Sequence, residues 1–475
     1  MRKQTAKSGV GQLQLQIAFL EEASDATKET QDNGPQASSS GGDPRRPTNP
    51  KRKWYSLYDK VYALPNLETA WQKVQANDGA PGIDRVSVAR FGQDALARLQ
   101  HLAADLQKKT YRPQPVRRVF IPKSGGGQRP LGIPTVRDRI VQQALLQVME
   151  PIFESKFSKL SHGFRPDRGC ATALSVVDRA VRHGYSWVVD ADIRTFFDNV
   201  DHGLLVSAVN EEISDGSVLH LITQILKAGI AHPSVTDVEP TELGVPQGGP
   251  LSPLLSNLYL HRFDVAMATA GYGLVRYADD FVIFAKSEEA ANSALDLSRH
   301  VLEDELKLSL HPEKTRVVSV MAGFAFLGYH YFGEEGSGRV VKEVRPKSAQ
   351  RFRDAIRKRT PTLKTQRRRK ARHVTLPRLL KNESVKQMIL SVNRHLLGWH
   401  GYFRGVWSRY PNSPFRNFDG FVRQRVRTAI TGRVGSGWWN VRLNNRTLSA
   451  LGLLSLDALQ REYQNGLNAS PARKG

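Results

Sequence analysis

The sequence predicts an α+β fold divided into several structural units, and three observations carry that prediction. The chain has 475 residues, more than one hydrophobic core usually serves, so two to four units are expected. Residues Trp187–Ile193 are strongly β-branched, and further β-like runs stand on both sides of Asp279-Asp280. Other segments, such as residues 288–306, have helical spacing. We expect a mixed, largely antiparallel sheet with helices on one face.

The composition points to a polyanionic partner. The 69 Lys and Arg residues outnumber the 45 Asp and Glu residues, which gives a net charge of +24. Such an excess attracts nucleic acid, the commonest polyanion. No apolar run approaches the ~20 residues that a membrane span requires. The apolar stretch near the start is interrupted by Gln12, Gln14 and Gln16, which argues against a signal peptide.

Cysteine usage agrees with this interpretation. Cys170 is the one cysteine of the chain, so neither a disulfide within one chain nor a Cys-cluster zinc site can form. We therefore expect a cytoplasmic protein without a disulfide partner and without a membrane partner.

Individual elements follow from periodicity and capping signals. Residues 66–78 have helical spacing and end at a Gly- and Pro-containing turn. Val116–Ile121 is β-like, and a Gly-rich turn follows it. Val136–Met149 should be a helix with Thr135 as its N-cap. After Ser252 an apolar helix is expected, followed by the hairpin around Asp279-Asp280.

The character of the chain changes near both ends. Residues 23–53 hold almost no large apolar side chain, so they cannot bury enough surface to offset chain entropy and should be disordered. Beyond Pro346, eleven Lys and Arg residues between Arg351 and Arg372 face a single acid, Asp354. We place a domain boundary near residue 345.

Three carboxylates are candidates for a metal site. Asp192 ends a strand, and Asp279 and Asp280 sit at a hairpin tip. Adjacent anions repel each other unless a cation lies between them. Carboxylate oxygens suit Mg²⁺, and a two-metal site holds both oxygens of a phosphoryl transfer. The plain alternative is a polar turn, since Asp is a common turn residue.

The predicted metal ligands are Asp192, the adjacent Ile193, Asp279 and Asp280, of which the three aspartates would be catalytic. Asp190 lies two residues before Asp192 on the same face of the strand, so it could replace or assist Asp192. A strand and a hairpin that end together in carboxylates form the layout of a polymerase palm.

An ordered set of motifs makes a family resemblance specific. Together they resemble the reverse-transcriptase blocks of group II intron-encoded proteins, over roughly residues 54–440. The motifs are Arg129–Pro134, Ser161–Pro166, Ala191–Asp198, Gly244–Pro253, Tyr277–Asp280, Glu313–Thr315 and Phe326–Gly328.

The resemblance implies a right-hand polymerase with fingers, palm and thumb, and an α-helical basic maturase (X) region. The activity implied is RNA-directed DNA polymerisation, combined with binding of the intron RNA to promote splicing and retrohoming. The expected parts are a disordered tail (1–53), fingers (54–170), palm with the metal site (171–344), helical thumb and maturase region (345–440) and a short C-terminal tail (441–475). Without a Cys-containing endonuclease region, the chain resembles the endonuclease-lacking bacterial class C, which implies the bacterial cytoplasm or nucleoid.

The resemblance also assigns the nucleotide site. Lys123 and Arg129 would contact the triphosphate, and Gln247 the incoming dNTP. Phe197 would exclude the 2′-hydroxyl that marks a ribonucleotide, while Phe196 packs in the core. Lys314 would assist the pyrophosphate. The alternatives are solvated cations, an ordinary turn at Gln247 and simple core packing of Phe197.

The C-terminal third resembles the maturase region in Asn393–Phe403 and Phe418–Arg427. Basic helices with aromatic residues among them suit a folded RNA, because they bind phosphate and stack on unpaired bases. The candidate RNA-binding residues are Arg367, Arg368, Arg369, Lys370, Trp399 and Tyr402.

The implied cofactor is Mg²⁺, as two ions, with Mn²⁺ as a substitute. The implied partners are intron RNA, primer or target DNA, and dNTPs. Three alternatives stay open at this level: a splicing-only RNA-binding maturase, an RNA-dependent RNA polymerase with the same palm, and a domesticated reverse transcriptase of phage defence or a CRISPR system.

Replacing Arg367, Arg368, Arg369 and Lys370 together by Gln should lower RNA affinity and flatten its salt dependence. Each phosphate that the variant no longer neutralises removes about 0.7–0.9 from the slope of log K against log salt. Filter binding between about 50 and 200 mM salt measures that slope. An unchanged slope would assign the basic run to solvent.

Overall fold

A computed structural model describes residues 53–122, 127–231, 238–239, 241–362, 375–407, 413–432 and 443–469. The chain divides into two compact units, Met1–Ser319 and Val320–Gly475. The expected disordered tail lies outside the described residues, apart from Lys53. Among the described helices, none combines the length and apolarity needed to cross a membrane.

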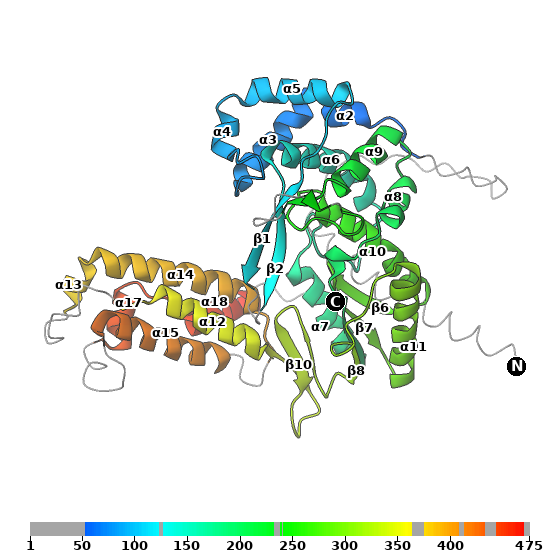
Figure 1. Cartoon of the computed structure of the whole chain (residues 1–475). Coiled ribbons are helices and arrows are strands. Elements are labelled where there is room, and N and C mark those ends of the chain that lie inside the picture. The colour runs from blue at the N-terminus through cyan, green and yellow to red at the C-terminus, as the bar shows by residue number, and fades with distance from the viewer. Residues whose placement is uncertain are drawn as a thin grey trace, which may run out of the picture. The chain divides into compact units, whose positions relative to one another are not determined.

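The first unit begins with a group of helices (Figure 1). The helix α3 packs against α6, and α2 contacts α3, α5 and α6. The predicted helix at Val136 is confirmed, and the Thr135 hydroxyl caps it by accepting from the backbone N–H of Asp138. The helices are α2 (Tyr58–Tyr62), α3 (Leu64–Asn77), α4 (Val88–Gly92), α5 (Ala95–Gln107) and α6 (Val136–Glu154).

Between α5 and α6 the chain forms a hairpin of β1 (Val116–Pro122) and β2 (Gln128–Ile133). The two strands pair antiparallel, with Arg129 opposite Ile121. On its other edge β1 pairs in parallel with the short β4 (Ile230–Ala231), which pairs with β5 (Val238–Glu239). The predicted strand at Val116 is therefore confirmed.

A second sheet carries the candidate carboxylates. Its strands are β3 (Trp187–Asp192), β6 (Gly273–Tyr277), β7 (Asp280–Ala285) and β8 (Arg316–Ser319), in the order β6-β7-β3-β8. All three pairings are antiparallel. The strand and the hairpin that the sequence predicts are thus adjacent in one sheet.

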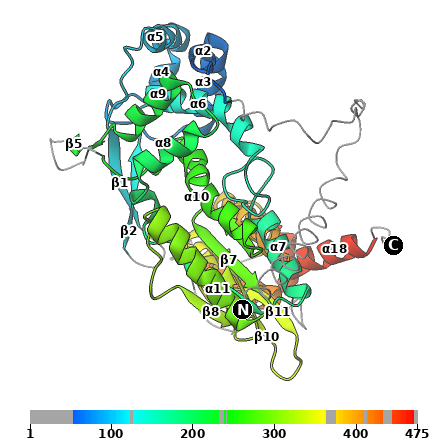
Figure 2. The same cartoon turned by 90° about the vertical axis from the view of Figure 1, so that its right-hand side faces the viewer.

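Helices surround this sheet. The helix α11 contacts β3, β7 and β8, and it lies beside β7 and β8 in Figure 2. The helices α10 and α7 contact β6. A π-helical turn, His300–Glu305, continues α11, so the predicted helix 288–306 is two elements. These and neighbouring helices are α7 (Cys170–Arg182), the 3₁₀ turn η2 (Phe196–Asp198), α8 (His202–Asn210), α9 (Gly216–Leu226), α10 (Ser252–Thr269) and α11 (Glu288–Arg299).

Both faces of the sheet are buried, which corrects the expectation of helices on one face. Neighbouring strand residues point to opposite faces, yet Val188 and Val189 are both fully buried, as are Val282 and Ile283. Near-continuous apolar strands are typical of a sheet covered on both sides. The polar residues of these strands include Asp192 and Asp280 at the strand ends, Asp190 within β3 and the fully buried Arg276 in β6.

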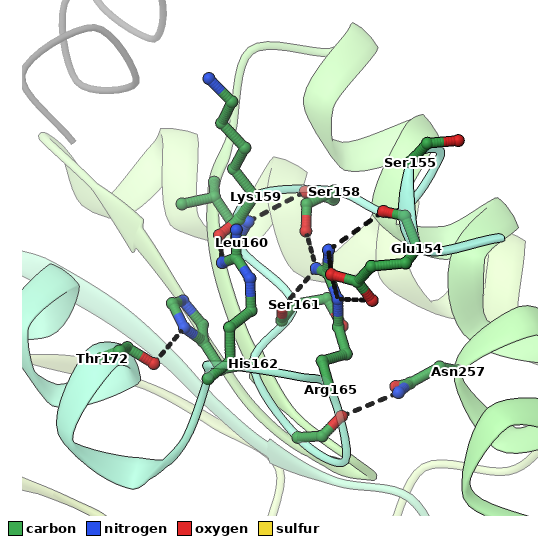
Figure 3. A network of polar contacts seen from close by, with 12 residues as sticks. Glu154, Ser155, Ser158, Lys159, Leu160, Ser161, His162, Arg165, Thr172 and Asn257 are labelled. Carbon is green, nitrogen blue, oxygen red and sulfur yellow. Dashed lines mark hydrogen bonds and ion pairs between the residues drawn. The ribbon is translucent and has the colours of Figure 1, made fainter. Parts of the chain in front are cut away.

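The loop between α6 and α7 is held by a polar network (Figure 3). The Arg165 guanidinium donates to both carboxylate oxygens of Glu154 and to the carbonyls of Ser158 and Ser161. Nδ1 of His162 lies 2.9 Å from the Thr172 hydroxyl. Because Arg presents its donors in a rigid fork, one side chain fixes several backbone groups of this loop.

The second unit combines a small antiparallel sheet with helices. The strands are β9 (Phe324–Phe326), β10 (Tyr329–Gly333) and β11 (Val340–Val344), in the order β11-β10-β9. The helices are α12 (Pro346–Arg359), α13 (Leu376–Leu380), α14 (Glu383–Phe403), α15 (Ser413–Thr431), α17 (Asn445–Ala450) and α18 (Leu456–Ala469). The two helices predicted around Asn393–Phe403 and Phe418–Arg427 are present.

The boundary near residue 345 differs from the observed division after Ser319. Hydrogen bonds explain the difference, since they join the small sheet to α14. The Tyr329 hydroxyl donates to the carbonyl of Tyr402, and the Tyr402 hydroxyl donates to the carbonyl of Leu327. Composition changes only at the helices, but the sheet before them belongs to the same unit.

The segment expected as a C-terminal tail is structured where it is described. The helix α18 contacts α14 and α15. Leu448 and Leu456 are buried, and the side chain of Asn393 bonds the backbone of Gly452 and Leu454. Residues 443–469 are therefore part of the helical unit.

The buried His162 should make the first unit less stable in acid. Burial, with the charges of Arg168, Arg165 and Arg276, lowers the pKa of His162 to about 3, against about 6.5 in the unfolded chain. Stability is therefore complete above about pH 6.5 and falls as pH drops toward the folded pKa, by up to about 1.4 kcal/mol per pH unit.

His162→Gln should remove this part of the pH dependence, as measured by urea unfolding at about pH 7 and about pH 5. The exposed His101 provides the control, because His101→Gln should keep the wild-type dependence. An equal loss of stability on acidification in His162→Gln and in the wild type would contradict this account.

Candidate active site

The backbone brings the three predicted carboxylates to one edge of the second sheet. Asp192 pairs with Asp280 in the β3–β7 register, and Asp280 pairs with Tyr277 across the hairpin. Ala278 and Asp279 form the turn, where Ala278 has a φ of +58°. Residues directly opposite in antiparallel strands lie within about 5.5 Å at Cα, so Asp192 and the turn are direct neighbours.

The charge of Asp192 affects the pKa of Asp279. Burial raises the pKa of the half-buried Asp279 above its ordinary value, and the negative charge of Asp192 raises it further, while Arg129 and Arg276 oppose this. Two carboxylates in one site disfavour each other's ionised form. A bound cation would relieve that repulsion.

These donors fit Mg²⁺, which binds proteins through one or two carboxylates and completes its shell with water and substrate phosphates. Among the described residues, no three His, Cys, Asp or Glu side chains form a metal-binding group by themselves. Ile193 is buried next to Asp192. Water and substrate phosphates can complete the shell of an ion that these carboxylates bind.

Lys314 contacts a carboxylate directly. Its ammonium lies 2.5 Å from Oδ2 of Asp192, and both side chains are partly exposed. The backbone N–H of His311 also donates to the Asp192 carbonyl. Lys314 therefore neutralises Asp192 in the protein by itself, and its contact with the pyrophosphate stays a prediction.

Asp190 is bound to another partner. Its Oδ2 lies 3.0 Å from the Arg316 guanidinium on the neighbouring strand β8. Asp190 thus joins β3 to β8 through its side chain, and its assistance to Asp192 stays a prediction.

A cavity of about 700 Å³ is lined by three of the predicted nucleotide-binding residues, whereas Lys314 is not among its lining residues. Arg129, Phe197 and Gln247 all line it. Phe197 is partly buried, whereas Phe196 is buried in the core, the division of roles that the sequence predicts. Lys123 lies outside the described residues.

The glycines after Gln247 allow a close backbone approach, but to β2. A Cβ on Gly248, at a φ of +127°, would lie 2.5 Å from the carbonyl oxygen of Gly132. The N–H of Gly132 donates to the Gln247 carbonyl over 2.8 Å. These contacts fix Gln247 against the β1–β2 hairpin, a role that the sequence reasoning missed.

Sequence reasoning also missed Phe164 and Arg139 among the lining residues. Phe164 is an exposed aromatic side chain with a φ of +59°. Arg139 donates to the carbonyls of Asp78 and Ala80. Phe164 belongs to the quoted Ser161–Pro166 motif, so it could have been found, but nothing local marks Arg139.

In the second unit, the two described RNA-binding candidates differ. Trp399 is 8% exposed and packs against Phe352 and Phe418, with ring centroids 4.6 and 4.7 Å apart. It therefore packs in the helical core, and its predicted contact with RNA stays a prediction. Tyr402 is 39% exposed.

Tyr402 lines a groove of about 510 Å³ together with Arg359, Arg394 and His395. Cations beside an aromatic ring suit a nucleic-acid backbone and its bases. Arg367, Arg368, Arg369 and Lys370 lie outside the described residues, so the structure says nothing about that basic run.

Comparison with known proteins agrees with this geometry. The family "Reverse transcriptase (RNA-dependent DNA polymerase)" matches residues 121–331. Protein YkfC of Escherichia coli K12 is 38% identical over 314 residues, which cover 57% of this chain and 82% of that protein.

Two intron-encoded relatives match a shorter part. Group II intron-encoded protein LtrA of Lactococcus lactis subsp. cremoris is 41% identical over 213 residues, 44% of this chain and 34% of that protein. The putative COX1/OXI3 intron 2 protein of Saccharomyces cerevisiae is 32% identical over 198 residues, 42% of this chain and 23% of that protein. The matches thus cover about a third or less of these two relatives. With the aspartates at one sheet edge and the motif order in place, the chain belongs to the reverse transcriptase family.

Proposed function

We propose that this chain is the RNA-directed DNA polymerase of a group II intron and also acts as a maturase. One observation carries the polymerase part: Asp192 and the Asp279-Asp280 turn meet at a sheet edge, and Arg129 both acts on Asp279 and lines the nucleotide-sized cavity. An anionic cluster beside such a cavity has no use in a protein that only binds RNA.

Asp192, Asp279 and Asp280 would hold Mg²⁺, with Mn²⁺ as a substitute, together with Ile193. When bound, the two ions supply an activated primer 3′-hydroxyl and a stabilised pyrophosphate leaving group. Arg129 offers a cation to the triphosphate, and the partly buried ring of Phe197 limits the space for the sugar. Gln247, fixed by its backbone bond to Gly132, orients the incoming dNTP. Lys123 would add a second cation.

The maturase part rests on charge and on the helical unit. The chain carries a net charge of +24, and the groove with Arg359, Arg394 and Tyr402 offers phosphate and base contacts. The intron-encoded relatives support intron RNA and primer or target DNA as partners, and a role in splicing and retrohoming. We expect these nucleic acids to be met in the bacterial cytoplasm or at the nucleoid.

Asp279→Asn should reduce primer extension on an RNA template by at least about 10²-fold, the scale of removing one electrostatic interaction with the transition state. RNA affinity should stay within about twofold, because the substitution removes a negative charge and no RNA-binding group. Primer extension with dNTPs and filter binding measure the two quantities. Asp304→Asn, on an exposed helical turn, is the matched control and should match the wild type.

If the wild-type chain binds RNA but incorporates no dNTP, that result would refute the proposed polymerase activity and favour a splicing-only maturase. A large loss of RNA binding in Asp279→Asn would instead show that the turn is structural.

Phe197→Val should raise incorporation of ribonucleotides relative to dNTPs by about 10- to 100-fold. Shortening the side chain removes the barrier to a 2′-hydroxyl, and such steric discrimination is worth about 1–3 kcal/mol. Single-nucleotide incorporation with each NTP and its dNTP counterpart measures the ratio. Phe164→Leu removes another ring from the same cavity without placing a β-branched side chain at its positive φ, and it should leave the ratio unchanged. Equal use of NTPs by the wild type would point to an RNA-dependent RNA polymerase.

A further inference from the structure

We propose that Arg276 is a positioning residue, which fixes the Ala278-Asp279 turn and so holds Asp279 in place. The inference rests on the proposed function and names a residue that acts through another. Arg276 directly precedes Tyr277 in the chain, yet it is 0% exposed and is not among the described residues that line the nucleotide cavity.

The guanidinium of Arg276 joins three groups. Its Nε and Nη2 donate to the two carboxylate oxygens of Asp264 on α10, over 2.7 and 2.6 Å. Its Nη1 donates to Oδ1 of Asn257, over 3.0 Å, and to the carbonyl oxygen of Ala278, over 2.9 Å. One side chain therefore connects the helix α10 with the backbone of the turn.

Stability alone does not account for this pair. The Asp264 side chain is 1% exposed, so both charges are removed from water. Replacing a buried ion pair by apolar residues of similar volume is often neutral or stabilising. Of the groups that Arg276 contacts, Ala278 is the one next to a catalytic carboxylate. Precise placement of Asp279 is the benefit that this arrangement offers.

The turn needs such support because of its backbone. Ala278 has a φ of +58°, in the left-handed region that costs about 1–2 kcal/mol for a residue with a Cβ. Strained conformations persist where the surroundings fix them, and they concentrate at functional sites. The hydrogen bond from Arg276 to the Ala278 carbonyl is one such constraint.

The loop between α6 and α7 supplies a second constraint. The backbone of Arg276 donates to the Leu160 carbonyl over 2.9 Å and accepts from the N–H of His162 over 2.8 Å. A Cβ on Gly163 would lie 2.3 Å from the nitrogen of Ala278, so the loop lies directly against the turn.

Asn257 links the two constraints. Its amide donates to the Gly163 carbonyl over 2.8 Å (Figure 3), while its oxygen accepts from Arg276. Arg165 anchors the far side of the same loop. The turn that carries Asp279 is thus held between α10 and this loop, with Arg276 contacting both.

Three variants test the inference. Arg276→Lys keeps the charge but loses the fork that reaches Asp264, Asn257 and Ala278 together. Arg276→Met with Asp264→Leu removes both charges and leaves neither unpaired. Arg262 lies on α10, like Asp264, and forms an ion pair with Glu305 of the π-helical turn. Arg262→Met breaks this partly exposed pair and is the matched control.

Each variant is measured for kcat and dNTP KM in primer extension, for Mn²⁺ affinity by electron paramagnetic resonance, and for its urea midpoint. Arg276→Lys and the double variant should lower kcat by about 10- to 100-fold, the scale of a 1 Å misplacement. The dNTP KM should stay within about threefold, and Mn²⁺ affinity should fall about tenfold. The double variant should keep a near-wild-type urea midpoint, and Arg262→Met should match the wild type throughout.

A folded double variant with wild-type kcat and Mn²⁺ affinity would overturn the inference and leave the pair a structural one. Should the double variant not fold, Arg276→Lys decides on the same two quantities. The Mn²⁺ titration, with Asp279→Asn as the baseline, decides even if the wild type extends no primer. A wild type that extends no primer would refute the proposed polymerase function but not the positioning role of Arg276.

Discussion

The antiparallel pairing of β3 with β7 is the constraint on which the rest of the site depends. Its register places Asp192 opposite Asp280, and the hairpin of β6 and β7 then carries Asp279 at its turn. A slip of one residue would send every side chain of β3 to the other face. Residues on both faces of β3 are buried. The slip would also move Asp190 and Asp192 to the face opposite their present one. The packing of β3 therefore favours the observed register, and this register places Asp192 opposite Asp280.

The cluster of anions lies where that core ends. Val188 and Val189 are buried in the middle of β3, whereas Asp192 is its last residue. Lys314 lies on Asp192, and Arg129 and Arg276 act on Asp279. Asp192 and Asp279 thus each have a nearby cation, which limits the repulsion between the two carboxylates when no metal is bound. Asp280 is exposed at the same sheet edge.

Local sequence signals predicted the elements well. The β-branched run at Trp187 and the Thr135 cap of the helix at Val136 are properties of neighbouring residues, and the structure contains both elements. Motif order also pointed to Asp192, Phe197 and Gln247, which the fold brings to one region. What the sequence could not predict depends on contacts between residues distant in the chain. Trp399 is buried because Phe352 and Phe418 surround it, and Lys314 meets Asp192 across 122 residues.

Arginine shows why composition predicts a partner but not the residues that bind it. The excess of 24 positive charges suits nucleic acid, yet several arginines use their donors inside the protein. Arg165 binds the carbonyls of Ser158 and Ser161, Arg139 binds those of Asp78 and Ala80, and Arg276 binds that of Ala278. Five donors in a planar fork suit this use better than the ammonium of lysine. An arginine at the centre of a motif can therefore serve the geometry of the site without touching its substrate, and burial separates the two roles where sequence cannot.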